Sequence, residues 1–277
     1  MASTEKITSA MKMVSAAKLK KTENTTLSFL PYRDKLNEAL SNYLSALEDK
    51  VSIPLAEQRE VKHVAIIAFS SSSGLCGVYN ANVGKLLLKT YNEYVQQLGE
   101  NNIEIHLFGK KIVDYATKNG INALATHPGL GEKLSFEMAA ELSDLMTNKF
   151  LNHDVDRVVM IYNHFKNAGV QLPQCDTILP LATDMLAPGN AFDYLVEPSK
   201  EAFINALVPK VVRTKFYSVM LDALTAEHGA RMTAMHIASD NANTLLQDLR
   251  REYNRARQDV ITSELIDIVG GAEALNK

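Results

Sequence analysis

One long run near the end of the sequence constrains the fold of this chain more than any other feature. Residues 211–269 contain no proline and a single glycine, Gly229. At a rise of about 1.5 Å per residue, a continuous helix over this run would be roughly 90 Å long, far more than a compact domain needs. The run therefore predicts a very long helix. The Gly270-Gly271 pair predicts its end, because glycine beyond a helix terminus readily adopts the left-handed conformation.

Small and apolar residues recur along this run in steps of three and four, which places them on one side of a helix. They are Ala238, Ala242, Leu245, Leu249, Tyr253, Ala256 and Val260. The opposite side is polar and charged. A narrow apolar stripe on so long a helix predicts a second helix packed along it, as in a coiled coil.

The first fifty residues also have a helical pattern. Ile7, Met11 and Val14 fall on one line along a helix, and the helical period resumes after Pro31. We expect Pro31 to kink or interrupt the helix, because proline lacks a backbone N–H and its ring crowds the preceding turn. The two terminal segments are the candidates to pair with each other, and we expect them to form an antiparallel coiled coil.

Between the terminal segments, the apolar pattern changes to that of strands. Short apolar runs at 63–70, 103–109 and 156–165 alternate with helical stretches, which predicts a mainly parallel sheet covered by helices. The runs 174–181 and 193–198 each contain a proline near their end and are interpreted as additional edge strands.

We therefore predict an α/β fold in which a Rossmann-like α/β domain is inserted between two long helices that form an antiparallel coiled coil. The predicted boundaries are 1–50 for the N-terminal helix, 61–198 for the α/β domain and 199–277 for the C-terminal helix. Ser199 is the candidate cap of the C-terminal helix.

Composition excludes several classes of function. The chain of 277 residues has a net charge of −3, which argues against nucleic-acid binding as its main task. Its two cysteines, Cys76 and Cys175, suit a reducing compartment and make no metal cluster. No apolar run approaches the roughly 20 residues of a membrane-spanning helix, and no signal or transit peptide is recognised.

The most tempting chemical site is the Ser/Gly loop at residues 70–80, which lies where a strand runs into a helix. Such loops can hold phosphates, but neither of the glycine patterns typical of nucleotide-binding loops is present. Gly74 and Gly77 are interpreted as turn glycines. Cys76 is a candidate nucleophile, although no histidine or aspartate partner can be nominated from spacing, and a small buried thiol is the favoured interpretation.

No other group of residues indicates catalysis or ligand binding. The seven histidines show no metal-ligand spacing. His228 and His236 lie on one predicted helix and are expected to face a partner or solvent. Glu264 and Asp267 share a helix face and are expected to be exposed or interface carboxylates. We predict no catalytic residue, no metal site and no cofactor.

Five separate stretches resemble the gamma subunit of the rotary F-type ATP synthases, in a bacterial-like form. They are 6–21 (KITSAMKMVSAAKLKK), 74–80 (GLCGVYN), 227–242 (EHGARMTAMHIASDNA), 253–258 (YNRARQ) and 261–274 (ITSELIDIVGGAEA). The resemblance extends over essentially the whole chain.

This resemblance implies a non-catalytic rotor shaft that couples proton translocation to ATP synthesis and hydrolysis. The coiled coil would enter a hexamer of alternating alpha and beta subunits, and the α/β domain would lie near the epsilon subunit and the membrane c-ring. The family likeness also implies that Arg257 and Gln258 contact a beta-subunit loop, with Met11 in the same partner-lined region. A peripheral position on the cytoplasmic face of the bacterial inner membrane is expected.

The sequence departs from the family pattern in two places. The family usually has further helix upstream of Lys6, so contacts of that stretch are not expected here. It also commonly has an acidic and then a basic residue before Gly-Leu-Cys-Gly, where this chain has Ser72 and Ser73. The polar contacts of those charges are therefore expected to be absent.

Two alternatives to the shaft come from other classes of protein. One is an α/β thiol enzyme with Cys76 as nucleophile and the helical hairpin as a dimerisation arm. The other is a free coiled-coil adaptor. Neither accounts for all five matching stretches.

Overall fold

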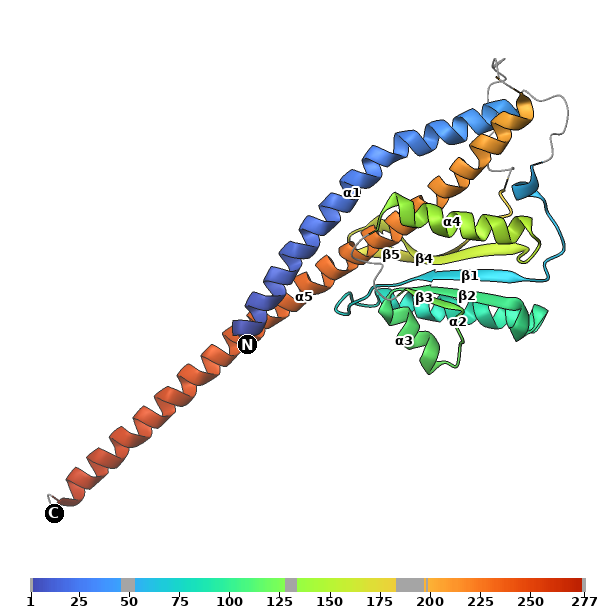
Figure 1. Cartoon of the computed structure of the whole chain (residues 1–277). Coiled ribbons are helices and arrows are strands. Elements are labelled where there is room, and N and C mark those ends of the chain that lie inside the picture. Colours follow the sequence, from blue (N-terminus) through green and yellow to red (C-terminus); the bar gives the residue numbers. More distant parts are fainter. Residues whose placement is uncertain (1, 46–52, 128–133, 183–196, 198, 276–277) are drawn as a thin grey trace.

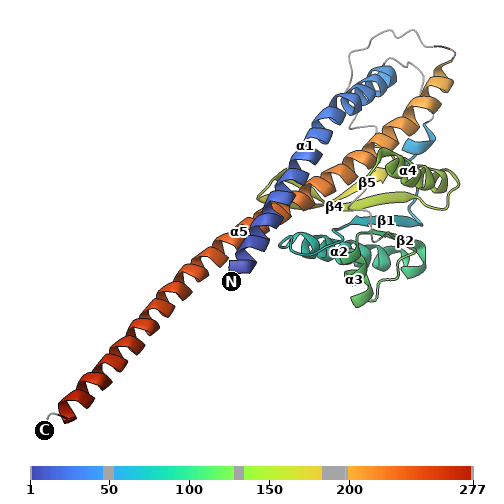
Figure 2. The ribbon, with the colours of Figure 1, turned by 60° about the vertical axis from the view of Figure 1, so that its left-hand side comes forward.

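The computed structural model describes residues 2–45, 53–127, 134–182, 197 and 199–275, and shows two long helices joined to an α/β domain. Helix α1 (Ala2–Ser45) and helix α5 (Lys200–Leu275) lie side by side over the length of α1. The α/β domain packs against the first half of α5, whose second half projects alone beyond the N-terminus (Figures 1 and 2). No helix among the described residues is both long enough and apolar enough to cross a membrane.

The α/β domain contains one five-stranded sheet in the order β3-β2-β1-β4-β5. The strands are β1 (Val64–Phe69), β2 (Ile103–Phe108), β3 (Ala125–His127), β4 (Arg157–Asn167) and β5 (Val170–Leu179). The first four run parallel, and β5 pairs with β4 in the antiparallel direction. The predicted mainly parallel sheet is confirmed, and the run 174–181 supplies most of the edge strand β5.

Helices cover both faces of the sheet. They are α2 (Tyr79–Leu98), α3 (Lys110–Lys118) and α4 (Phe136–Leu151), with the 3-10 turns η1 (Pro54–Ala56) and η2 (Glu100–Asn102). Alternate residues of a strand face opposite sides. Accordingly, Ile66 packs with residues of α2 and α3, and Ile67 packs with residues of α4 and α5 (Figure 1). All of β1 is buried, as expected for a central parallel strand.

The two long helices pair in one constant antiparallel register. The ring centroids of Phe29 and Tyr217 are 4.9 Å apart, and those of Tyr43 and Phe203 are 4.8 Å apart. Both pairs correspond to the same alignment of α1 on α5, so the predicted antiparallel coiled coil is confirmed. Extended to the start of α1, this register brings Met11 level with Met235.

Of the two changes predicted within the helices, a kink or interruption at Pro31 and a stop at Gly270-Gly271, only the stop is wrong. Helix α1 continues through Pro31 without interruption and is bent (Figure 1), because proline removes a single backbone hydrogen bond while the flanking turns stay packed on α5. Helix α5 continues through Gly270-Gly271 to Leu275. Glycine permits a left-handed residue without requiring one, and its cost inside a helix is only about 1 kcal/mol.

The other boundary predictions concern the C-terminal helix and the last strand. Helix α5 begins at Lys200, one residue after the predicted cap, and it passes through Pro209. The Ser199 hydroxyl accepts a hydrogen bond from the Ala202 amide at 3.2 Å, which confirms Ser199 as a cap. The expected strand at 193–198 lies outside the described residues. The domain limits 1–50, 61–198 and 199–277 stay predictions.

We predict that Gly109→Ala destabilises the chain strongly. Gly109 has φ of +100° between β2 and α3, and a Cβ there would lie 2.7 Å from the Ser70 carbonyl carbon and closer still to its oxygen. A backbone atom cannot move aside cheaply, so we expect the free energy of unfolding to fall by about 3 kcal/mol or more.

Gly120→Ala is the matched control, because Gly120 has φ of +72° and no neighbouring atom lies within 4 Å of the place that a Cβ would occupy. Conformational strain alone should cost about 1–2 kcal/mol there. Urea unfolding of both variants separates the two effects. Equal losses would contradict the steric role of the Ser70 carbonyl.

Candidate functional site

The free half of α5 is the most exposed part of the structure. Every residue from Gln247 to Val269 is exposed. The predicted stripe at Leu249, Tyr253 and Val260 was expected to be covered, and in this chain it is not; Tyr253 is 67% exposed. In the register of the coiled coil, Ala2 lies level with residues near 244, and no described element packs on α5 beyond that level.

The predicted contact residues lie at two separate levels of this shaft. Arg257 and Gln258 are adjacent on the free half of α5 and are both exposed. Adjacent helical residues point about 100° apart. Met11 is half-buried on α1, level with Met235, which places it about 33 Å from Arg257 along the axis. The fold therefore brings Arg257 and Gln258 together but does not bring Met11 to them.

Arg231 anchors α5 to the loop that follows β1. Its guanidinium lies 2.7 Å from the Glu227 carboxylate, and both side chains are nearly buried. The same guanidinium donates to the Ser73 hydroxyl at 3.0 Å and to the carbonyl oxygens of Ser73 and Gly74 at 3.3 and 3.4 Å. No pattern in the sequence indicates this link. Ser73 thus makes a polar contact at a position where the family likeness had suggested the loss of one.

The loop itself is packed against α5 rather than open to a substrate. Cys76 is 2% exposed, in a cluster with Tyr79, Ala226 and Ala230. Its sulfur lies 3.1 Å from the Asn80 amide nitrogen and 3.7 Å from the Ser71 hydroxyl. The interpretation of Cys76 as a buried structural thiol is confirmed.

Strand β4 provides a second attachment. Asp222 of α5 accepts a hydrogen bond from the Phe165 amide at 2.9 Å, and its other oxygen lies 2.6 Å from His164 Nδ1. Gly229 leaves room for the Phe165 ring, because a Cβ at residue 229 would lie 2.8 Å from that ring. These contacts bring the sheet and the shaft close together.

Helix α4 provides a third attachment, through a bidentate ion pair. The Arg213 guanidinium donates to the two Asp144 oxygens at 2.7 and 2.8 Å. This pairing raises the pKa of Arg213 above its ordinary value. Asp222 is nine residues from both Arg213 and Arg231, so it points about 180° away from them around α5. Rotation of the shaft relative to the α/β domain would therefore break several of these contacts at once.

His228 is buried between the helices, whereas the sequence had placed it against a partner or solvent. It is 5% exposed, and its Nδ1 has no hydrogen-bond partner among the described residues. Burial, together with the nearby charges of Arg231 and Lys18, lowers the pKa of His228 to about 4. The neighbour that covers His228 is α1 of the same chain. Only the register of α1 on α5 shows which residues of α5 lie under α1.

His236 has an exposed side chain, 3.3 Å from Asp240. Glu264 and Asp267 are exposed on the free half of α5, as expected. Within the described ranges, no group of histidine, cysteine or acidic residues could hold a metal ion.

Comparisons with known proteins agree with this geometry. A family model described as ATP synthase matches residues 1–275. The chain is 46% identical to the ATP synthase gamma chain of Bacteroides fragilis, over 98% of this chain and 95% of that protein. It is 44% identical to the ATP synthase gamma chain of Flavobacterium johnsoniae, over 99% and 94% of the two chains.

Solved structures share the fold at lower sequence identity. A chain of the central stalk and c-ring of the Tetrahymena thermophila mitochondrial ATP synthase has a TM-score of 0.60 at 23% identity, over 84% of this chain and 99% of that one. A chain of the Euglena gracilis mitochondrial ATP synthase has a TM-score of 0.54 at 18% identity, over 99% and 95%.

We predict that Arg231→Met loosens the anchor between α5 and the loop. The change leaves the nearly buried Glu227 without its arginine, and removing one partner of a buried ion pair typically costs about 3–5 kcal/mol. Arg251→Met is the control, since Arg251 forms only an exposed pair with Asp248 at 3.3 Å and should cost under about 1 kcal/mol. Urea unfolding measures both; equal losses would show that the anchor is no stronger than a surface pair.

We also predict that His228 makes the chain acid-sensitive. The folded-state pKa of about 4 is below the ordinary 6.5, so the unfolded chain binds the proton more readily. This contribution to stability is present above pH 6.5 and is lost as the pH falls toward about 4, by roughly 2–3 kcal/mol.

His228→Gln should remove that part of the pH dependence, and His236→Gln is the control on the same helix. The measurement is the free energy of unfolding between about pH 7 and about pH 4.5, a window that spans most of the titration. A His228→Gln variant with the parental pH dependence would rule out this role.

Proposed function

The chain belongs to the ATP synthase gamma family, and on that basis we propose which of its surfaces meet the other subunits of the complex. As a gamma chain it is a non-catalytic subunit: the central shaft whose rotation couples proton translocation to ATP synthesis and hydrolysis. The proposal concerns the finer arrangement, that is, which segments contact which partners.

The free half of α5 enters the hexamer of alternating alpha and beta subunits. The observation that carries this assignment is the unbroken exposure from Gln247 to Val269, which includes large apolar residues such as Ile266, Ile268 and Val269. Contiguous exposed apolar surface is typical of an interaction site. A lone helix is also marginally stable in water, so a surrounding protein cavity would both cover and stiffen it.

The α/β domain lies at the opposite end of the shaft, toward the epsilon subunit and the membrane c-ring. The complex would then place this chain peripherally, on the cytoplasmic face of a bacterial inner membrane. The bacterial origin of the relatives supports this placement.

Torque passes between the two ends through the attachments of α5. The contacts of Arg231, Asp222 and Arg213 hold the α/β domain to the shaft at three points along its length. A domain attached in this way turns with the helix, so force applied at the domain reaches the free end of α5.

Arg257 and Gln258 contact a polar, acidic loop of a beta subunit in one state and release it in others. Arginine offers a rigid fork of five donors, and glutamine offers both a donor and an acceptor. Both side chains project from the exposed half of α5. Met11 contacts partners at a different level, where its flexible thioether suits changing neighbours.

The thiol-enzyme alternative has no support from the geometry. Cys76 is enclosed by Tyr79, Ala226 and Ala230, and its polar contacts are Ser71 and Asn80. A nucleophilic cysteine needs a base within hydrogen-bonding reach and a path for substrate.

We predict that Arg257→Ala or Gln258→Ala lowers the ATPase rate of a complex reconstituted with alpha and beta subunits. Losing a charge-assisted contact of about 1.5–3 kcal/mol should slow turnover about tenfold or more. The stability of the isolated chain should be unchanged, because both residues are exposed.

Arg250→Ala is the control, an exposed arginine on the same free segment outside the matching stretch 253–258. It should assemble and turn over at the parental rate. If the Arg257 and Gln258 variants do the same, these residues are not the contact with the beta subunit.

A further inference from the structure

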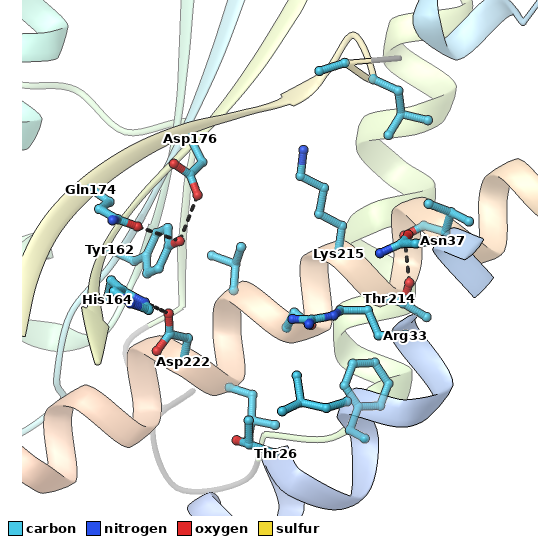
Figure 3. A pocket seen from close by; sticks show the side chains of 18 of the residues that line it. Thr26, Arg33, Asn37, Tyr162, His164, Gln174, Asp176, Thr214, Lys215 and Asp222 are labelled. Atoms are coloured by element: carbon cyan, nitrogen blue, oxygen red, sulfur yellow. Dashed lines mark hydrogen bonds and ion pairs between the residues drawn. The ribbon is translucent and has the colours of Figure 1, made fainter. Parts of the chain in front are cut away.

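A cavity of about 820 Å³ lies between α1, the first half of α5 and the outer strands β4 and β5 of the sheet (Figure 3). Its volume is within the roughly 300–1,000 Å³ of small-molecule sites in proteins. It is separate from the free half of α5, which contributes no residue to its described lining. The described residues that line it come mainly from α1, β4, β5 and the first half of α5.

The two sides of the cavity differ in chemistry. One side is formed by aliphatic side chains of the coiled coil, among them Leu27 and Leu30 of α1 and Val219 of α5. Water against such a surface is released with a gain in free energy when an apolar ligand replaces it. This side suits an unbranched hydrocarbon chain.

The opposite side is polar, and its groups are held to the walls. The Tyr162 hydroxyl lies 2.8 Å from Asp176 and 3.1 Å from Gln174, and His164 lies 2.6 Å from Asp222. Figure 3 shows Tyr162 beside Gln174 and Asp176 on the sheet, and His164 of the sheet beside Asp222 of α5. These hydrogen bonds hold the polar side chains against the walls of the cavity. The side chains therefore do not extend into the space between the sheet and α1.

The carboxylates of the lining already have polar partners. Asp176 accepts from the Tyr162 hydroxyl, and Asp222 is satisfied by His164 and by the Phe165 amide. A third carboxylate, Glu23, lies 3.9 Å from the Lys20 ammonium on the α1 side. These contacts hold the three carboxylates against the walls of the cavity.

Of the cations among the described lining residues, the Lys215 ammonium lacks a direct counter-ion. The Arg33 guanidinium lies 2.7 Å from Asp34. The Lys215 ammonium instead donates to the Thr177 carbonyl at 3.1 Å, and no ion pair joins it to a described carboxylate within 4.0 Å.

Lys215 is directed toward this space. Figure 3 shows its side chain extending from α5 toward β5, with the Arg33 side chain reaching into the same space from α1. Burial lowers the pKa of Lys215, and the more distant Asp176 opposes that shift. A carboxylate bound beside the ammonium would supply the missing opposite charge.

We propose that this cavity binds an anionic amphiphile, a fatty-acid-like monocarboxylate whose head lies against Lys215 and whose tail lies along the aliphatic side of the coiled coil. An ion-paired head fixes the orientation, and the apolar tail supplies most of the buried surface. The occupant is the free monomeric acid and not a lipid held in a bilayer.

The test is calorimetric titration of the full chain with laurate below its micellar concentration. We expect saturable binding of one laurate per chain and at least tenfold weaker binding by Lys215→Met. Lys210→Met is the matched control, an exposed lysine of α5 that does not line the cavity, and should bind as the parent does. Dodecanol, which has the same chain length without the charge, should bind the parent more weakly than laurate.

A second variant keeps the test decisive if Lys215→Met folds poorly. Thr26→Trp places a large ring in the cavity from the α1 side and should abolish laurate binding without changing Lys215. The absence of saturable binding, equal binding of laurate and dodecanol, or parental affinity in both variants would each overturn the proposal. So would Lys215-dependent binding to phosphatidylglycerol vesicles without binding of free laurate.

Discussion

The structure depends on one stretch of α5 that belongs both to the core of the α/β domain and to the coiled coil. Between Leu207 and Met235 the helix buries one side against the sheet and α4, through residues such as Val212 and Phe216, and pairs with α1 along another. The same residues are therefore the core of the α/β domain and the first half of the shaft. A helix that is buried on so many sides cannot slide or turn without opening a hydrophobic core, which is a large cost in free energy.

Polar contacts then give this apolar packing a single register. Arg231 reaches the loop after β1, Asp222 reaches the backbone of β4, and Arg213 reaches α4. Apolar contact alone tolerates small shifts along a helix, whereas directed hydrogen bonds to backbone groups do not. The small residues at Gly229 and Ala230 allow the close approach that these bonds need.

The free half of α5 is exposed instead of packed. There no described element packs against the helix, and apolar side chains remain in contact with solvent. In a single chain this would be a liability, but in a subunit of a rotary complex it is the surface that other subunits enclose. The cavity beside Lys215 lies along the half of α5 that packs on the rest of the chain, where the middle of α1 bows away from α5 (Figures 1 and 2).

By itself, the sequence determined the type and order of the elements. Helical spacing identified both long helices, the change to short apolar runs identified a mainly parallel sheet, and five matching stretches identified the family. Such patterns are local, and each is visible within one element.

The tertiary structure decided what depends on neighbours: that Pro31 and Gly270 remain inside helices, that His228 is buried against α1, and that Arg231 bonds to Ser73. It also showed that Tyr253 is exposed among the described residues, although its spacing is the same as that of a buried seam residue. Burial is a property of the pair of helices and their register, and no periodicity within one helix contains that register.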